Sequence, residues 1–198
     1  MQSNPGTTEF HGLPNPLDVA SVLSVIGALE SGAPGHHSVS LTGGEPLEQV
    51  EFLARLCPEL GSAGIRTYLE SNGVLPEALK KLLPHLDVIA MDYKLESASG
   101  ARTDVEAHRA FLQIASAKEV FVKTVVTSVT SEEEVRGCAE MVAGVGRGIP
   151  LIIQPVTPVG EGMWAPSATQ LIAFQAAGAG LLDDVRVIPQ CHKLLGLL

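Results

Sequence analysis

The sequence is poor in cysteine and in positive charge, and it lacks a long hydrophobic run. Its three cysteines, Cys57, Cys138 and Cys191, lie far apart, which excludes a zinc ribbon and a C-x-x-C redox pair. Thirteen basic residues face 22 acidic ones, and the net charge of −9 argues against nucleic acid and against an anionic membrane surface as partners. No apolar run approaches the roughly 18 residues of a membrane span, and no signal-peptide pattern is present. We therefore expect a soluble, cytoplasmic protein.

The 198 residues, 45% of them hydrophobic, suit a single domain over 1–198 with a sizeable core. Short apolar runs alternate with amphipathic segments throughout. Continuous apolar strands between such helices are typical of a parallel sheet covered by helices, so the sequence predicts an α/β fold. The strands are expected at 37–42, 67–70, 88–91, 120–126, 151–153 and 185–188.

Several helix starts carry capping signals. Asn15 is expected to cap the first helix, with Pro16 at its first position. Capping boxes are expected at Thr103-x-x-Glu106 and Ser131-x-x-Glu134, and Ser167 is expected to start an alanine-rich helix. Cys57 and Cys138 share helical faces with apolar residues and are expected in the core, whereas Cys191 is expected in a terminal loop.

Polar residues follow each predicted strand, where ligands bind in α/β proteins. A proline-bounded Gly-Gly turn follows the first strand, and glycine lets backbone groups approach a ligand closely. The carboxyl ends of parallel strands share one edge of a sheet, so we expect one binding site there. The predicted set of strand ends is Thr42-Gly43-Gly44-Glu45, Glu70-Ser71-Asn72, Asp92-Tyr93-Lys94, Lys123-Thr124, Gln154-Pro155 and Pro189-Gln190-Cys191-His192.

The order of these segments resembles the radical S-adenosylmethionine superfamily, and within it the 7-carboxy-7-deazaguanine synthase family. The Gly-Gly-Glu-Pro turn at 43–46 specifies only the superfamily. The proline, glutamine and histidine near the terminus point to the synthase family. The segments that carry the resemblance are 40–47, 69–73, 86–94, 154–158 and 185–193.

The resemblance implies a partial parallel (β/α) barrel that binds S-adenosylmethionine and a [4Fe–4S] cluster. An adenosyl radical would convert 6-carboxytetrahydropterin to 7-carboxy-7-deazaguanine, a step of queuosine-type biosynthesis, with Mg²⁺ assisting. Flavodoxin or ferredoxin would supply the electron. The cofactor supplies the difficult chemistry in such enzymes, and the protein supplies orientation.

Roles for individual residues follow from the same resemblance. Gly43, Gly44 and Glu45 match the motif that receives the methionine amino group. Asp92 and Lys94 match contacts to the ribose and the methionine carboxylate. The remaining expected cofactor contacts are Ser71, Asn72 and Gln154, and the expected substrate contacts are Thr42, Glu70 and His192, with Lys123 as a further lining residue.

The sequence departs from the family at its start. It has no C-x-x-x-C-x-x-C loop, no first barrel strand and no threonine for Mg²⁺, so neither cluster nor magnesium ligands are present. We expect the chain alone to be inactive, and an unpaired edge strand to favour a homodimer. The chain is either a fragment of a synthase or a non-catalytic module that binds S-adenosylmethionine or a nucleoside. A Schiff-base lyase using Lys94 or Lys123, and a relative of the activases of glycyl-radical enzymes, are further alternatives.

Overall fold

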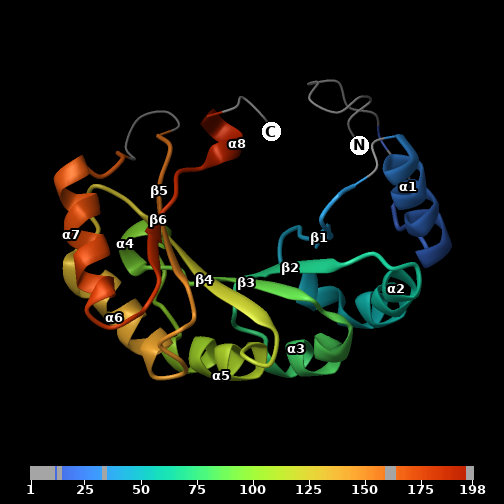
Figure 1. The fold of residues 1–198 in the computed structure, drawn as a ribbon, viewed down its shortest axis with the longest axis horizontal. Helices are drawn as coiled ribbons and strands as arrows, with labels where there is room; N and C mark the ends of the chain where they lie inside the picture. Colours follow the sequence, from blue (N-terminus) through green and yellow to red (C-terminus); the bar gives the residue numbers. More distant parts are fainter. Residues whose placement is uncertain (1–11, 13–14, 33–34, 159–163, 195–198) are drawn as a thin grey trace.

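The computed structural model describes residues 12, 15–32, 35–158 and 164–194, and it contains one six-stranded parallel sheet (Figure 1). The strands are hydrogen-bonded in sequence order. Their bounds are β1 Val39–Leu41, β2 Thr67–Ser71, β3 Val88–Asp92, β4 Glu119–Val126, β5 Leu151–Pro155 and β6 Val185–Val187. All six predicted strands are therefore confirmed with small shifts of their ends, as is the α/β class. The sheet is an open partial barrel because β1 and β6 do not pair with each other.

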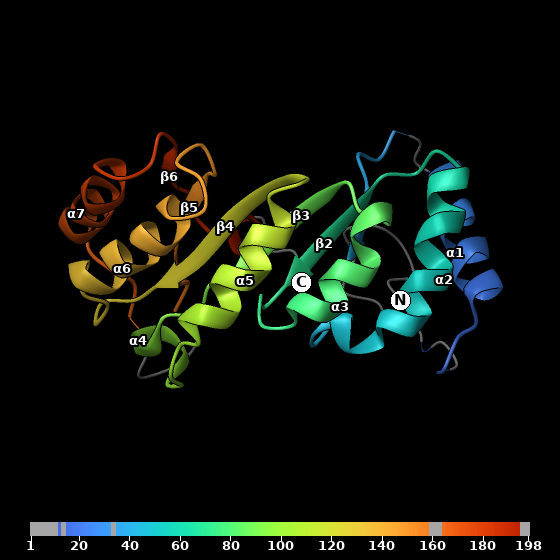
Figure 2. The same ribbon diagram turned by 90° about the horizontal axis from the view of Figure 1, so that it is seen from below.

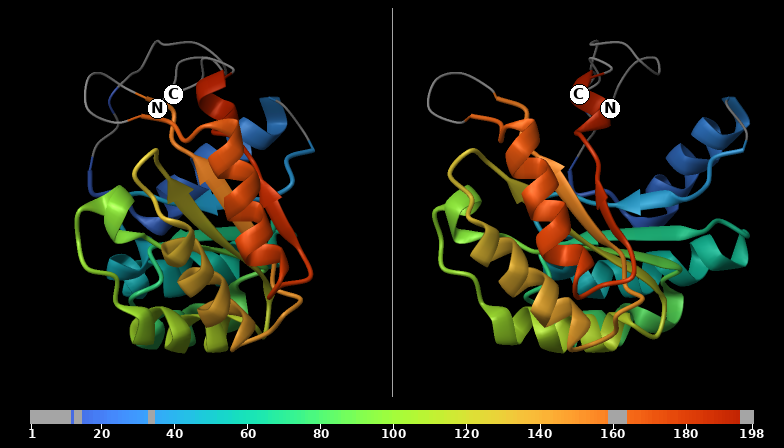
Figure 3. Two further views of the ribbon diagram at one scale, coloured as in Figure 1. Left: turned by 90° about the vertical axis from the view of Figure 1, so that its left-hand side faces the viewer. Right: turned by 60° about the vertical axis from the view of Figure 1, so that its left-hand side comes forward.

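Five helices cover the convex side of the curved sheet, as Figures 1 and 2 show. These helices are α2 Val50–Ser62, α3 Pro76–Leu82, α5 Val105–Ala115, α6 Glu132–Ala143 and α7 Ala168–Ala179. Figure 3 shows the same arrangement from the β6 side. None of these five helices covers the concave face of the sheet.

The remaining helices are short or lie at the margins of the sheet. Helix α1 lies beyond β1, next to α2 (Figure 1). Their bounds are α1 Val19–Gly32, the 3₁₀ helices η1 Pro46–Gln49 and η2 Leu83–His85, α4 Glu96–Ser99 and α8 Cys191–Leu194. Within the described ranges, no helix combines the length and hydrophobicity that a bilayer crossing requires.

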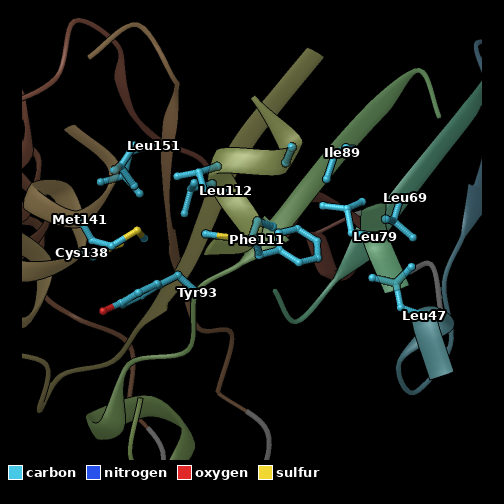
Figure 4. Close-up of a cluster of buried hydrophobic side chains, with 14 of the residues drawn as sticks. Leu47, Leu69, Leu79, Ile89, Tyr93, Phe111, Leu112, Cys138, Met141 and Leu151 are labelled. Carbon is cyan, nitrogen blue, oxygen red and sulfur yellow. The ribbon is translucent and has the colours of Figure 1, made fainter. Parts of the chain in front are cut away.

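The core lies between the sheet and the helices on its convex side (Figure 4). Leu69 of β2 and Ile89 of β3 are completely buried there, and Phe111 and Leu112 of α5 pack beneath them. Burying one such side chain contributes about 1.5–3 kcal/mol. The alternation that sends Leu69 into the core sends Tyr68 and Glu70 to the concave face. The core packing thus determines which side chains lie on the concave face.

Two of the predicted helix caps are wrong. The first helix begins at Val19, and its cap is Asp18, whose Oδ1 accepts a hydrogen bond from the Ser21 amide at 2.8 Å. The cap of α5 is Asp104, which accepts from the Ala107 amide. Thr103 instead donates its hydroxyl to the Lys94 carbonyl at 2.6 Å. At α5 the Thr103 hydroxyl is engaged by the Lys94 carbonyl, so the neighbouring Asp104 is left to cap the first turn. At α1 the helix begins three residues later than expected, so Asp18 and not Asn15 lies next to its first turn.

The other local predictions hold, with one exception. Ser131 and Ser167 both form complete capping boxes, with Glu134 and Gln170 respectively. Cys57 and Cys138 are buried core residues. Cys191 was expected in a loop, but it begins the single helical turn α8.

Candidate functional site

Polar residues within or just after the first four strands line one cavity of about 270 Å³, which we call the rim pocket. Parallel strands bring their carboxyl ends to one edge of the sheet, so residues far apart in sequence meet there. Its lining consists of Thr42, Gly43, Gly44, Glu45, Glu70, Ser71, Asn72, Ala90, Asp92, Lys94 and Lys123. The predicted convergence is therefore present for the first four strands, whereas Thr124 and the predicted residues at the ends of β5 and β6 are absent from this lining.

The Gly-Gly turn places main-chain groups rather than side chains against the rim pocket. Gly43 has φ of 126°, a conformation that L side chains rarely adopt, so this position favours glycine strongly. A Cβ on either Gly43 or Gly44 would meet no atom within 4 Å. Packing therefore does not require these glycines, and the open space beside them leaves room for a ligand against the backbone.

Glu45 joins the ends of β1 and β2. Its Oε1 accepts from the Leu47 amide at 3.1 Å and from the Ser71 hydroxyl at 2.9 Å. Its Oε2 accepts from the Asn72 amide at 2.8 Å. An ionised carboxylate has about four acceptor positions, so about one remains for a ligand. Glu45 thus fixes the shape of the pocket, and the hydroxyl of Ser71 is occupied by the same contact.

Asp92 stands between two lysines at the end of β3. Its Oδ2 lies 3.0 Å from the Nζ of Lys94, and its Oδ1 lies 4.0 Å from the Nζ of Lys123. Tyr93, between Asp92 and Lys94, points into the core (Figure 4), where its ring lies 4.8 Å from that of His108. Strand alternation therefore anchors the segment through Tyr93 and presents the flanking charges to the pocket.

A second cavity, of about 570 Å³, lies along the concave face of the sheet, and we call it the wall cavity. Its polar residues include Glu70, Lys123 and Gln154, and its apolar part is formed by Tyr68, Phe121, Ile152 and Ile188. Burial and the nearby charge of Glu70 raise the pKa of Tyr68 to about 12, so that its hydroxyl is neutral at pH 7. A flat organic ligand suits an aromatic and aliphatic wall of this kind.

The structure divides the predicted residues between these two cavities. Gln154, expected beside the cofactor residues, lines the wall cavity and is absent from the rim-pocket lining. The side chain of His192 lies outside the described part of the structure. Reasoning from strand ends missed Tyr68, Phe121 and Arg186, which also line the wall cavity. The signal for them was present, since Tyr68-x-Glu70 and Phe121-x-Lys123 alternate with core residues.

A larger groove of about 610 Å³ lies between α1 and β1, away from the strand ends. Its polar side chains contact one another. The Nδ1 of His36 lies 2.6 Å from Glu30, and the Nη1 of Arg66 lies 2.7 Å from the Nε2 of His37. We therefore assign the candidate site to the rim pocket and the wall cavity.

The cysteines do not fit a [4Fe–4S] cluster. Cys57 and Cys138 are buried in α2 and α6, beneath the sheet, whereas Cys191 is exposed in α8. Burial raises the pKa of Cys57 to about 11 and raises the pKa of Cys138 as well, which opposes the thiolate form that iron needs. Among the described residues, no three potential ligands of the His, Cys, Asp and Glu types gather as a metal site.

Known proteins resemble this chain in sequence, although no family model matches it. A 7-carboxy-7-deazaguanine synthase of Geobacter sulfurreducens is 37% identical over 199 residues, which covers 100% of this chain and 79% of that protein. One of Thermococcus kodakarensis is 34% identical over 203 residues, covering 98% of this chain and 76% of that protein. Four further proteins of the same name are 31% to 34% identical.

Solved structures share the fold. A domain of the pyruvate-formate lyase-activating enzyme of Bacteroides vulgatus has a TM-score of 0.62 at 18% identity, covering 77% of this chain and 99% of that one. Streptococcus suis SuiB bound to S-adenosylmethionine has a TM-score of 0.65 at 12% identity, covering 91% of this chain and 45% of that one. At these identities the likeness concerns the fold alone.

Proposed function

This chain belongs to the 7-carboxy-7-deazaguanine synthase family of radical S-adenosylmethionine enzymes, and we propose on that basis that its rim pocket binds S-adenosylmethionine and its wall cavity a carboxylated pterin. The observation that carries the proposal is the convergence of the predicted cofactor residues, Gln154 apart, on a single cavity. The reaction that we propose for these two cavities in the family is the conversion of 6-carboxytetrahydropterin to 7-carboxy-7-deazaguanine.

The polar and charged groups of the rim pocket suit the polar groups of S-adenosylmethionine. Its ammonium group needs acceptors, which the carbonyls of Gly43 and Gly44 and the remaining oxygen position of Glu45 offer. Lys94 suits the methionine carboxylate, and Asp92 suits the ribose hydroxyls. When bound, S-adenosylmethionine supplies the adenosyl group from which radical chemistry begins. The residues of the pocket bind and orient it.

The wall cavity suits the substrate because it lies next to the rim pocket and combines an apolar wall with a few polar groups. Glu70 can accept hydrogen bonds from the N–H edge of a pterin. Thr42, from the rim, and Gln154, from the wall, can add hydrogen bonds to the substrate or to the cofactor. The contribution of His192 stays a prediction from the sequence.

The chain by itself is proposed to bind S-adenosylmethionine without cleaving it. Its three cysteines do not converge, so they cannot supply the three thiolates of a [4Fe–4S] site. This observation favours the second candidate function, a module that binds S-adenosylmethionine or a nucleoside. The Mg²⁺ ion, a flavodoxin or ferredoxin reductant, a homodimer and a cytoplasmic location stay predictions from the sequence.

The test is a titration of the purified chain with S-adenosylmethionine, followed by isothermal calorimetry. We expect saturable binding of one equivalent, weakened about 10-fold or more in Asp92→Asn and Lys94→Met, which each lose a charged contact. Lys80→Met is the matched control, because Lys80 is exposed on α3. Absence of binding by the folded wild-type chain, or equal affinity in all variants, would contradict the assignment of the rim pocket.

A further inference from the structure

The rim pocket and the wall cavity share two lining residues, Glu70 and Lys123. These residues come from β2 and β4, with β3 between them. Ala90 lies in register with Glu70, and Asp92 lies in register with Lys123. Because the alanine side chain is short, no long side chain of β3 stands beside Glu70 at this level. Glu70 and Lys123 therefore mark the junction where a ligand of the wall cavity meets a ligand of the rim pocket.

The ammonium group of Lys123 has spare hydrogen-bonding capacity. Its Nζ lies 4.0 Å from the Oδ1 of Asp92, which is longer than a hydrogen bond. Asp92 is already engaged by Lys94 at 3.0 Å. Within the described residues, the structure shows no hydrogen bond from the Lys123 ammonium. Its side chain is only 26% exposed, so it remains a partly desolvated charge that an anion can neutralise.

The other cation of the wall cavity is occupied. The guanidinium of Arg186 donates to both carboxylate oxygens of Asp184, at 2.8 and 2.6 Å. A bidentate pair of this kind satisfies both charges. Of the two basic residues that line the wall cavity, Lys123 is therefore the one available to a ligand.

We propose that Lys123 is a specificity-determining residue that binds the carboxylate of the substrate and so selects a carboxylated pterin over a neutral one. This inference rests on the proposed function, which places the pterin in the wall cavity. Glu70, on the opposite side of the junction, repels a carboxylate and accepts ring N–H groups. The two charges together orient the ligand across β2, β3 and β4.

The test compares two ligands of nearly the same size and shape, the anionic 6-carboxytetrahydropterin and its neutral 6-carboxamide, by anaerobic calorimetric titration of the full chain. Hydrogen bonds to charged groups imply that the wild-type chain binds the carboxylate about 10- to 100-fold more tightly than the amide. Lys123→Met should abolish this preference while leaving affinity for the carboxamide within about twofold. Lys123→Arg should keep the preference, and Lys80→Met, on the convex side, should behave as wild type.

Each outcome decides the proposal. If Lys123→Met keeps the preference, or if the wild-type chain has none, Lys123 does not select the carboxylate, whereas pterin binding and the proposed function stand. If neither pterin binds a chain that binds S-adenosylmethionine, the substrate of the proposed function is wrong and this inference falls with it. Retention of the preference by Lys123→Arg shows that loss in Lys123→Met reflects charge and not misfolding.

Discussion

Removing the Glu45 carboxylate should destabilise the protein far more than its position on the rim suggests. Glu45→Ala deletes the acceptor of three hydrogen bonds, from the Leu47 amide, the Ser71 hydroxyl and the Asn72 amide. Ser71 and Leu47 are buried, so their donors cannot all turn to water. The loss is therefore a desolvation penalty as well as a loss of bonds.

The magnitude follows from the number of bonds and the exposure of the site. A hydrogen bond to a charged group contributes about 1.5–3 kcal/mol, and water at the half-buried Glu45 compensates part of the sum. We expect a loss of about 3 kcal/mol in the free energy of unfolding. For a chain of this size, that corresponds to a Tm lower by about 6 to 12 °C. Glu45→Gln, which keeps one carbonyl acceptor, should lose about half as much.

Urea and thermal unfolding followed by circular dichroism measure these differences. Glu48→Ala is the matched control, because Glu48 is an exposed residue of η1, the 3₁₀ helix that Glu45 caps, and should change stability by about 0.5 kcal/mol or less. If Glu45→Ala and Glu48→Ala unfold alike, Glu45 does not join the two strand ends. Its carboxylate would then be free for a ligand.

Two further predictions concern the cysteines and the acid response. In the native chain we expect only the exposed thiol of Cys191 to react rapidly with Ellman's reagent, because Cys57 and Cys138 are buried. After unfolding, all three thiols should react. Rapid labelling of more than one thiol in the native chain would contradict the placement of Cys57 and Cys138 in the core. Burial raises the pKa of Glu134, but hydrogen bonds from Ser131 and Ser97 lower it by more, so its pKa lies below the ordinary 4.5. Its stabilising contribution is therefore complete above about pH 5 and is lost as the pH falls through the native pKa. Glu134→Gln should destabilise the protein at pH 7, and the deficit in urea unfolding should shrink as the pH falls below the ordinary 4.5. A deficit independent of pH would contradict this.

The order of the elements was predictable from the sequence because strand and helix periods differ clearly here. The apolar run around Ile89 and the amphipathic pattern around Cys57 each admit one structure. Cap positions were less predictable, because Thr103 and Asp104 are neighbours and both are good caps. Only the tertiary contact of Thr103 with the Lys94 carbonyl decides between them.

Most of the residues that line the rim pocket were also predictable, since parallel strands end on one side, although Gln154 was wrongly expected among them. The partnerships within it were not. Nothing in the Gly-Gly-Glu-Pro pattern indicates that Glu45 accepts from Ser71 and Asn72, which lie a whole βα unit later in the sequence. The separate wall cavity, with Gln154 in it, depends on the curvature of the sheet, and curvature is a property of all six strands together.

The aromatic side chains on the concave face predict how the enthalpy of ligand binding depends on temperature. Tyr68 and Phe121 stand half-exposed on that face, so water hydrates their rings until a ligand displaces it. Transfer of apolar surface out of water lowers the heat capacity. The enthalpy of binding in the wall cavity must therefore become steadily more favourable as temperature rises.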